Sequence, residues 1–363
     1  MMDTLPNKLK KGRGAVTNRT NRYERLVAEA VDDGWDGLDE AKDPVPPLRT
    51  TLMRDTSKTI IARNSSPDVP FEQSINPYRG CEHGCVYCFA RPTHAFLGLS
   101  PGLDFESRIL FKPDAARLLE RELRRSSYTC RVLAMGTNTD PYQPTEKSLR
   151  ITRSILEILA AFNHPVGIVT KSALVLRDLD ILAPMAERGL AQVCVSVTTL
   201  DRGLANKLEP RAATPAKRIE TIRALAAAGV PTGVMAAPMI PGLNDQELEA
   251  ILQAAHQAGA RLASYILLRL PLEIKDLFVE WLETHAPDKA RHVMSLVQQT
   301  RGGKAYQSTY GQRMRGTGEY AGLLKRRFDV ASRRLGFDAE ERFELDTSRF
   351  RPPLARDGQL ALF

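Results

Sequence analysis

The chain has 363 residues, of which 43% are hydrophobic and 26% are charged, and its formal net charge is +8. This composition is ordinary for a folded protein and excludes a wholly disordered chain. Because the sequence has neither a run of 18 apolar residues nor an apolar segment near its start, we expect no transmembrane helix, no secretory signal and a cytoplasmic location.

An irregular extension is expected over residues 1–70, where basic stretches, acidic stretches and the motif PVPP replace any periodic pattern. From there the chain alternates strand-like and helix-like runs. The expected strands cover residues 71–78, 130–137, 165–172, 191–199, 231–240 and 261–270. The expected helices cover residues 114–125, 145–162, 176–189, 215–229 and 245–259. Thr214 with Pro215 predicts one helix start, and Asn244 with Glu247 predicts a capping box.

Six β-α units of this kind predict parallel strands joined by crossover helices, in either a doubly wound sheet or a complete or partial barrel. Both architectures place chemistry at the carboxyl ends of the strands, where the polar stretches GTNTD, TKS, SVTT and PMIPG fall. We therefore expect a core over residues 71–285. A helical region over 286–344 and a flexible tail over 345–363 are expected to follow it.

The stretch CEHGCVYC holds three of the five cysteines, Cys81, Cys85 and Cys88, directly after the first expected strand. Thiolates in such a cluster prefer zinc or the iron of an iron–sulfur cluster. Structural zinc would need a fourth ligand, such as His83 or His94. A [4Fe–4S] cluster held by three cysteines would leave one iron open to a small molecule, and we favour this interpretation.

The spacing C-x3-C-x2-C, with the aromatic Tyr87 before the last cysteine, resembles the signature of the radical S-adenosylmethionine (SAM) superfamily. The resemblance implies a partial (β/α)6 barrel of the TIM type, with the N-terminal extension and the C-terminal helical region added to it. It also implies that SAM chelates the open iron and is cleaved to a 5′-deoxyadenosyl radical, which abstracts a hydrogen atom from a substrate. An electron donor such as flavodoxin or ferredoxin is implied as a partner.

The stretches NPYRGCEHGCVYCFARPTH, GTNTDPYQPTEK and PMIPGLND resemble the spore photoproduct lyase-like group, often labelled DNA repair photolyase. This resemblance implies that Thr139, Lys171 and Ser196 contact SAM, and Tyr87 is expected to belong to the same cofactor site. Asp140, whose carboxylate could hold a polar group of SAM or substrate, is a candidate catalytic residue. True lyases carry a hydrogen-donating cysteine where this chain has Thr137, and neither Cys130 nor Cys194 matches that place. Tyr142 is the alternative donor, so the reaction is expected to be lyase-like with an unassigned substrate.

Basic residues gather near both ends of the chain, seven in residues 1–25 and nine in residues 301–334, as expected for a protein that binds DNA or, alternatively, RNA. A second interpretation keeps the chemistry but gives it a protein or small-molecule substrate. A third is a non-catalytic zinc protein that binds nucleic acid. Aromatic and cationic residues that could stack bases interleave in a glycine-rich segment: Tyr306, Tyr310, Arg313, Arg315 and Tyr320.

The chain ends in QLALF, which resembles the pentapeptide that docks bacterial repair proteins on the DNA sliding clamp. The residues of this motif are Gln359, Leu360, Ala361, Leu362 and Phe363. Burial of its three large apolar side chains in a groove is worth roughly 5–8 kcal/mol before the cost of ordering the tail. The sequence therefore predicts the clamp as a second partner.

Overall fold

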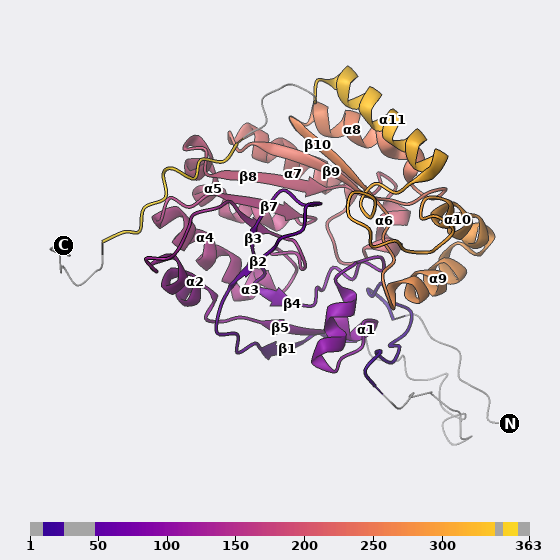
Figure 1. Ribbon diagram of the computed structural model, residues 1–363, viewed down its shortest axis with the longest axis horizontal. Coiled ribbons are helices and arrows are strands. Elements are labelled where there is room, and N and C mark those ends of the chain that lie inside the picture. The colour runs from indigo at the N-terminus through magenta and orange to yellow at the C-terminus, as the bar shows by residue number, and fades with distance from the viewer. Residues whose placement is uncertain (1–9, 25–47, 338–343, 355–363) are drawn as a thin grey trace.

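The computed structural model describes residues 10–24, 48–337 and 344–354, so the predicted clamp motif Gln359–Phe363 lies outside the described residues. No helix in these ranges is both long and apolar enough to cross a membrane. Two sheets and an outer set of helices make up the described chain (Figure 1).

The larger sheet has seven strands in the order β10-β9-β8-β7-β6-β3-β2. Their bounds are β2 Ile61–Arg63, β3 Gln73–Ile75, β6 Leu133–Met135, β7 Val166–Thr170, β8 Ala191–Ser196, β9 Thr232–Met239 and β10 Leu262–Leu267. All neighbouring pairs from β3 to β10 are parallel, and β2 pairs antiparallel with β3 at the edge. The smaller sheet, in the order β1-β5-β4, comprises β1 Thr51–Arg54, β5 Arg108–Phe111 and β4 Tyr78–Arg79.

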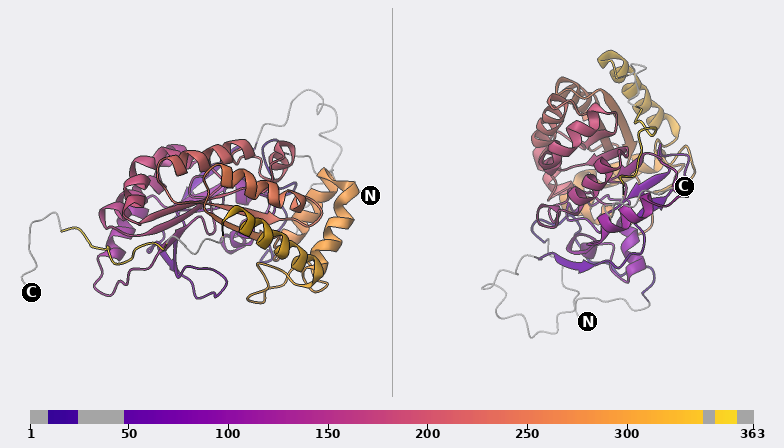
Figure 2. Two further views of the ribbon diagram at one scale, coloured as in Figure 1. Left: turned by 90° about the horizontal axis from the view of Figure 1, so that it is seen from above. Right: turned by 90° about the vertical axis from the view of Figure 1, so that its left-hand side faces the viewer.

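The parallel strands follow one another in chain order, without the reversal that marks a doubly wound sheet. Right-handed crossovers then put the connecting helices on a single side of the sheet, as in a barrel. Within the described residues the outermost strands β2 and β10 do not pair with each other, so the barrel is open. The predicted partial (β/α)6 barrel is confirmed, and Figure 2 shows its outer helical layer.

Helices form within all five ranges predicted for them, whereas the helices over residues 103–107 and 202–208 were not predicted. The bounds of the helices are α1 Leu103–Ser107, α2 Ala115–Leu123, α3 Glu146–Leu149, α4 Ile151–Ala161, α5 Leu179–Glu187, α6 Arg202–Leu208, α7 Pro215–Ala227, α8 Leu248–Gln257, α9 Ile274–His285, α10 Pro287–Gln299 and α11 Gly318–Leu335. Short 3-10 helices are η2 Arg91–Leu97, η3 Ala173–Asp178 and η4 Asp245–Glu247. In Figure 1, α11 lies along α8, where Arg327 pairs with Glu249 at 2.6 Å.

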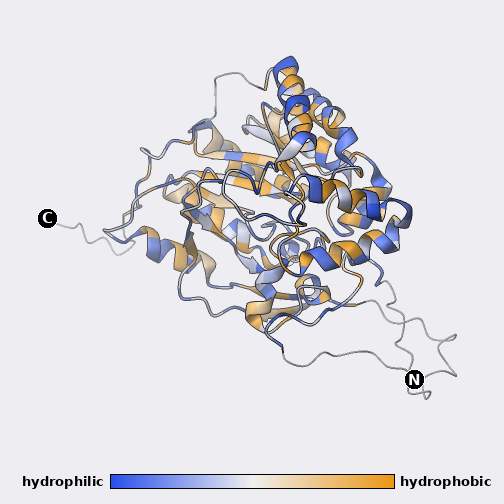
Figure 3. Ribbon diagram, turned by 45° about the vertical axis from the view of Figure 1, so that its right-hand side comes forward, coloured by the Kyte–Doolittle hydropathy of each residue, from blue (hydrophilic) through white to orange (hydrophobic). Residues whose placement is uncertain are grey.

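The main core lies between the sheet and this helical layer. Apolar side chains of the helices, such as Ile155, Leu182 and Ile222, are fully buried against strand residues such as Val193 and Val234. In Figure 3 the central strands are mainly hydrophobic, whereas the surrounding helices carry both hydrophobic and hydrophilic residues. The period of the apolar residues therefore predicted these elements correctly, because each element buries one stripe or face.

Two local predictions are wrong. The single helix expected over 145–162 is broken at Arg150, which has φ 55° and ψ 28°, and the buried Glu146 side chain accepts from the first turn of α4 at Thr152 N, 3.1 Å away. The capping box is also absent: Asn244 accepts from Ile240 N at 2.6 Å, and Glu247 accepts from Thr199 Oγ1 at 2.6 Å. Both side chains secure neighbouring loops and do not cap a helix.

The described part of residues 1–70 is integrated with the core. β1 pairs with β5 and β2 pairs with β3, while the irregular segment 10–24 buries Ala15 and Val16. Gly14 N and Ala15 N of this segment donate to the Glu106 carboxylate, at 2.8 and 2.7 Å, and not to a neighbouring strand.

Candidate functional site

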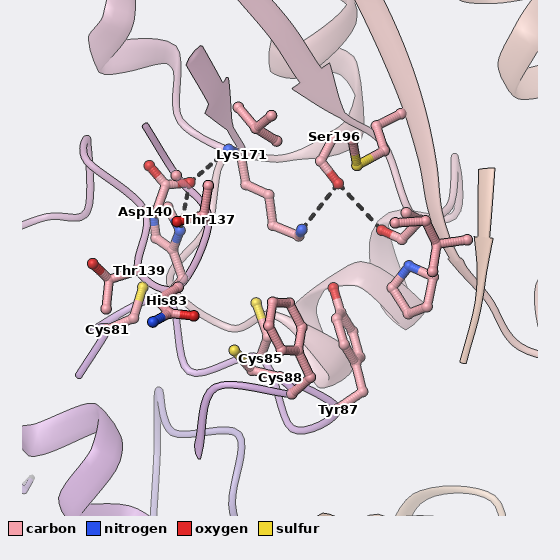
Figure 4. A pocket seen from close by; sticks show the side chains of 18 of the residues that line it. Cys81, His83, Cys85, Tyr87, Cys88, Thr137, Thr139, Asp140, Lys171 and Ser196 are labelled. Atoms are coloured by element: carbon pink, nitrogen blue, oxygen red, sulfur yellow. Dashed lines mark hydrogen bonds and ion pairs between the residues drawn. The ribbon is translucent and has the colours of Figure 1, made fainter. Parts of the chain in front are cut away.

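One pocket opens at the carboxyl ends of the parallel strands, where the sequence places its polar stretches (Figure 4). Its wall combines the cysteine loop with residues in or just after the carboxyl-terminal parts of β6, β7, β8, β9 and β10. The residues that line the pocket include Cys81, His83, Cys85, Tyr87, Cys88, Phe89, Gly136, Thr137, Thr139, Asp140, Thr170, Lys171, Ser196 and Arg269. Gly136, with φ 87°, allows close packing here, since a Cβ on it would lie 1.9 Å from Val169 O.

The three loop cysteines all line this pocket, and burial raises the pKa of each thiol. The pKa of Cys85 is raised to about 12, and those of Cys81 and Cys88 are also raised. Thiolates held in such surroundings need a cationic partner, as an iron–sulfur cluster provides. Among the described residues no three Cys, His, Asp or Glu side chains lie close enough together to hold a single metal ion. Three thiols that share one pocket are a donor set that fits a [4Fe–4S] cluster.

A buried ion pair between Arg91 and Glu106 supports the cysteine loop. These two residues and Gly14, which is hydrogen-bonded to Glu106, are called the buttress. The Arg91 Nη2–Glu106 Oε1 distance is 2.6 Å, and both side chains are fully buried. Arg91 also donates to the carbonyls of Gly84 and Cys85, at 3.1 and 2.8 Å. Glu106 accepts from Gly14 N at 2.8 Å, and a Cβ on Gly14 would lie 1.7 Å from Gly84 O, so this contact requires glycine. The buttress fixes the backbone that carries the thiols.

Tyr87 is held from behind by a second buried ion pair. Its hydroxyl donates to the Glu209 carboxylate, which is paired with Arg218. Burial would raise the pKa of Glu209, but Arg218, Lys171 and the hydroxyl of Thr198 hold it at about 2. Tyr87 therefore presents a fixed ring beside the last cysteine.

Asp140 is the centre of a hydrogen-bond network at the ends of β6 and β7. Its carboxylate accepts from Thr170 Oγ1 and Lys171 N, each at 2.7 Å, and from Tyr142 N at 2.9 Å, and His83 Nδ1 lies 3.4 Å away. Burial opposes its ionisation, but His83 and these donors lower the pKa of Asp140 to about 2. The network joins the two strand ends to the cysteine loop.

Lys171 and Ser196 meet across the pocket wall. The Lys171 ammonium donates to Ser196 Oγ at 2.9 Å, Ser196 donates to Ala237 O at 3.2 Å, and the ammonium also lies 5.9 Å from the centre of the Tyr87 ring. Thr139 donates to Tyr78 O at 3.2 Å. The structure thus brings the three residues expected to contact SAM together with the cysteines, while their role in SAM binding stays a prediction.

The structure does not bring Tyr142 to the pocket. Its ring is fully buried in the main core, with the Arg177 guanidinium 6.0 Å from the ring centre. The chain turns at Asp140, which accepts from Tyr142 N, and this turn directs the ring away. Tyr142 therefore cannot reach a substrate in this pocket as the hydrogen donor that the sequence interpretation made of it.

Besides the buttress, sequence reasoning missed four residues of the site or its support: Phe89, Glu209, Arg218 and Arg269. Arg218 could have been found, because it shares the buried helical stripe of Ile222 and Leu225, and a charge in such a stripe needs a partner. The other three lie in loops or at a strand end, where no periodic pattern distinguishes them.

Residues 75–255 match the radical SAM superfamily. An uncharacterized protein of Mycobacterium tuberculosis is 39% identical over 222 residues, which cover 61% of this chain and 65% of that protein. An uncharacterized protein of Methanocaldococcus jannaschii is 28% identical over 173 residues, which cover 48% of this chain and 62% of that protein. The chain thus matches less than two thirds of the length of either relative.

Two solved structures share the fold. Spore photoproduct lyase complexed with dinucleoside spore photoproduct superposes with a TM-score of 0.55 at 19% identity, covering 78% of this chain and 79% of that one. A variant of the lyase with bound AdoMet and dinucleoside spore photoproduct has a TM-score of 0.54 at 18% identity, covering 78% of each chain. The chain belongs to the radical SAM superfamily, through residues 75–255, and has the fold of spore photoproduct lyase.

Proposed function

We propose that this radical SAM enzyme binds a [4Fe–4S] cluster through Cys81, Cys85 and Cys88 and abstracts a hydrogen atom from a nucleic acid, with DNA as the first candidate. The supporting observation is that the three thiols share one pocket with the polar ends of the barrel strands. When bound, the cluster and SAM would supply a 5′-deoxyadenosyl radical in this pocket.

The chain's own residues would bind and orient SAM. The Lys171 ammonium, oriented by Ser196, suits the methionine carboxylate of SAM, and Thr139 adds a hydroxyl on the adjacent wall. The Asp140 carboxylate is already occupied by donors from the chain, so we assign it a positioning role and not one in catalysis. Tyr87, fixed by Glu209, would shield one side of the site.

Support for a nucleic-acid substrate comes from the net charge of +8 and from a solved relative that holds a dinucleoside spore photoproduct. Thr137 lines the pocket, whereas Cys130 and Cys194 are not among its lining residues. A hydroxyl O–H bond is too strong for the hydrogen donation that the lyases' cysteine performs. We therefore propose a radical reaction on nucleic acid without assigning it to thymine-dimer reversal.

The test is anaerobic reconstitution with iron and sulfide, followed by reduction with dithionite and addition of SAM. We expect 5′-deoxyadenosine, together with a paramagnetic resonance spectrum that changes when SAM binds. Cys85→Ser should abolish both signals. The matched control is Cys130→Ser, a half-buried cysteine outside the pocket, which should retain them.

Bound zinc without SAM cleavage would contradict this proposal and favour the zinc protein. SAM cleavage without nucleic-acid affinity would favour a protein or small-molecule substrate. Docking of Gln359–Phe363 on the sliding clamp and transfer of electrons from a flavodoxin or ferredoxin stay predictions. A clamp pull-down with the chain truncated after Gly358 tests the first of these.

A further inference from the structure

The glycine-rich segment 300–317 covers the carboxyl end of β10, beside the pocket. Leu267 N donates to Met314 O at 2.9 Å. The buried Arg301 donates to the carbonyls of Leu268 and Arg313, at 2.7 and 2.9 Å, and so secures the segment against the strand. The segment thus forms part of the surroundings of the pocket entrance.

Several of the side chains that the sequence offered for stacking bases are already used within the chain. Arg313 pairs with Asp68, Arg315 lies 4.2 Å from the centre of the Tyr265 ring, and Tyr320 donates to Asp245 at 2.5 Å. These three side chains therefore stabilise the fold and are not free to contact a nucleic acid.

Arg269 lies two residues after β10 and lines the pocket. Unlike the side chains just described, it has few partners within the protein. Its guanidinium lies 4.9 Å from the centre of the Phe89 ring, and Phe89 is 43% exposed. Nη1 donates only to the sulfur of Met314, at 3.4 Å, and Nε is buried without a partner. Within the described chain no carboxylate pairs with this guanidinium, in contrast to Arg91 and Arg218.

A second uncompensated cation lies nearby. Arg301 donates to carbonyl groups alone, and burial together with the charge of Arg269 lowers the pKa of Arg301 to about 10. Two guanidinium groups without an acid make this side of the pocket attractive to an anion. A guanidinium also presents a planar set of N–H donors that matches the oxygens of a phosphate, and it can be oriented by stacking on an aromatic ring.

We infer that Arg269, oriented on Phe89, binds a backbone phosphate of the nucleic-acid strand whose nucleotide enters the pocket. This inference rests on the proposed function and adds the phosphate contact that would place the substrate. The exposed Phe89 ring beside the guanidinium offers the same strand an apolar surface.

The test measures binding of a fluorescent single-stranded oligonucleotide to the reconstituted full chain, as a function of salt. Arg269→Gln should weaken binding about tenfold at low salt, because a charge-assisted hydrogen-bonded contact is lost. It should also reduce the salt slope by roughly 0.7, the share of one phosphate contact on a single strand. Arg269→Lys keeps the positive charge but lacks the planar set of N–H donors. It should therefore retain the salt slope of the wild type and bind the oligonucleotide with intermediate affinity.

Arg261→Gln is the matched control, because Arg261 precedes the same strand at its opposite end, donates to carbonyls of His256 and Ala260, and carries the same charge. It should bind like the wild type. If Arg269→Gln also binds like the wild type, or if both variants lose affinity equally, Arg269 is not the phosphate anchor. If the wild type itself binds no oligonucleotide, the nucleic-acid substrate fails as well, and the two failures are thereby distinguished.

Discussion

The charges of the buttress and the cations of the adjacent pocket differ in their hydrogen-bond partners. In the buttress, Glu106 and Arg91 pair at 2.6 Å, and the groups that complete their hydrogen bonds come from the chain itself. In the pocket, the Lys171 ammonium donates to the neutral hydroxyl of Ser196, and Arg269 donates only to the sulfur of Met314. Neighbouring parts of the molecule thus hold charges that stabilise the fold and charges suited to ligands.

This difference follows from the cost of burying charge. An ion that is removed from water must be paired and hydrogen-bonded, and the buttress satisfies this condition with protein groups alone. Half-buried cations with neutral partners keep most of their capacity to bind an anion. Whether a charged side chain has all its hydrogen-bond and ion-pair partners within the protein therefore distinguishes a structural charge from a functional one. Its degree of burial is a poorer guide.

The largest expected effect on stability comes from breaking the buttress. Glu106→Gln leaves Arg91 buried without a counter-charge, so the free energy of unfolding should fall by about 3–5 kcal/mol. Denaturant titration at neutral pH measures this change. Glu120→Gln, which breaks the exposed pair with Arg124, is the control and should cost no more than about 1 kcal/mol. Equal effects of the two variants would show that the buttress is not what secures the loop.

In the pocket the same kind of change should affect binding more than folding. Lys171→Met removes the cation proposed to bind the SAM carboxylate, a contact worth about 1.5–3 kcal/mol, so SAM should bind roughly 10- to 150-fold more weakly. Calorimetric titration with SAM measures this loss. Lys217→Met, which removes a surface cation paired with Glu220, should leave SAM affinity unchanged. Unaltered affinity in Lys171→Met would place the SAM carboxylate elsewhere.

The same contrast explains which parts of the molecule could be predicted from the sequence. The barrel strands follow from their apolar runs, and the rule that chemistry lies at the carboxyl ends correctly brings Thr139, Lys171 and Ser196 into one pocket with the cysteines. The rule concerns strand ends only. It therefore could not show that the chain turns after Asp140 and buries Tyr142 in the core.

The buttress was beyond sequence reasoning for a different reason. Gly14 lies in an irregular segment and Glu106 in the short helix α1, and the two bonded residues are 92 positions apart in the sequence. Nothing in the local pattern of either segment indicates the other. Buried pairs between irregular segments become visible only when the chain is folded.

Low pH should destabilise the region next to the buttress, because His94 packs there against Phe105 and becomes protonated. Its Nε2 donates to Arg108 O at 3.0 Å, and its ring packs edge-on against Phe105 at 5.2 Å. Burial, only partly offset by this hydrogen bond, lowers the pKa of His94 from 6.5 to about 4. Between these values the unfolded chain binds a proton that the folded chain does not, so stability that is present above pH 6.5 is lost as the pH falls toward 4.

From pH 7 to pH 5 this linkage should cost about 2 kcal/mol. His94→Gln cannot take up the proton in either state, so its free energy of unfolding should fall by about 2 kcal/mol less than that of the wild type over the same interval. Denaturant titrations at the two pH values provide the comparison. His256→Gln is the control, since His256 also packs edge-on against a phenylalanine, Phe337, at 5.5 Å, but on the outer helix α8. If His94→Gln keeps the full acid sensitivity, the proton binds elsewhere, and the region below the cysteine loop is no more sensitive to acid than the outer helices.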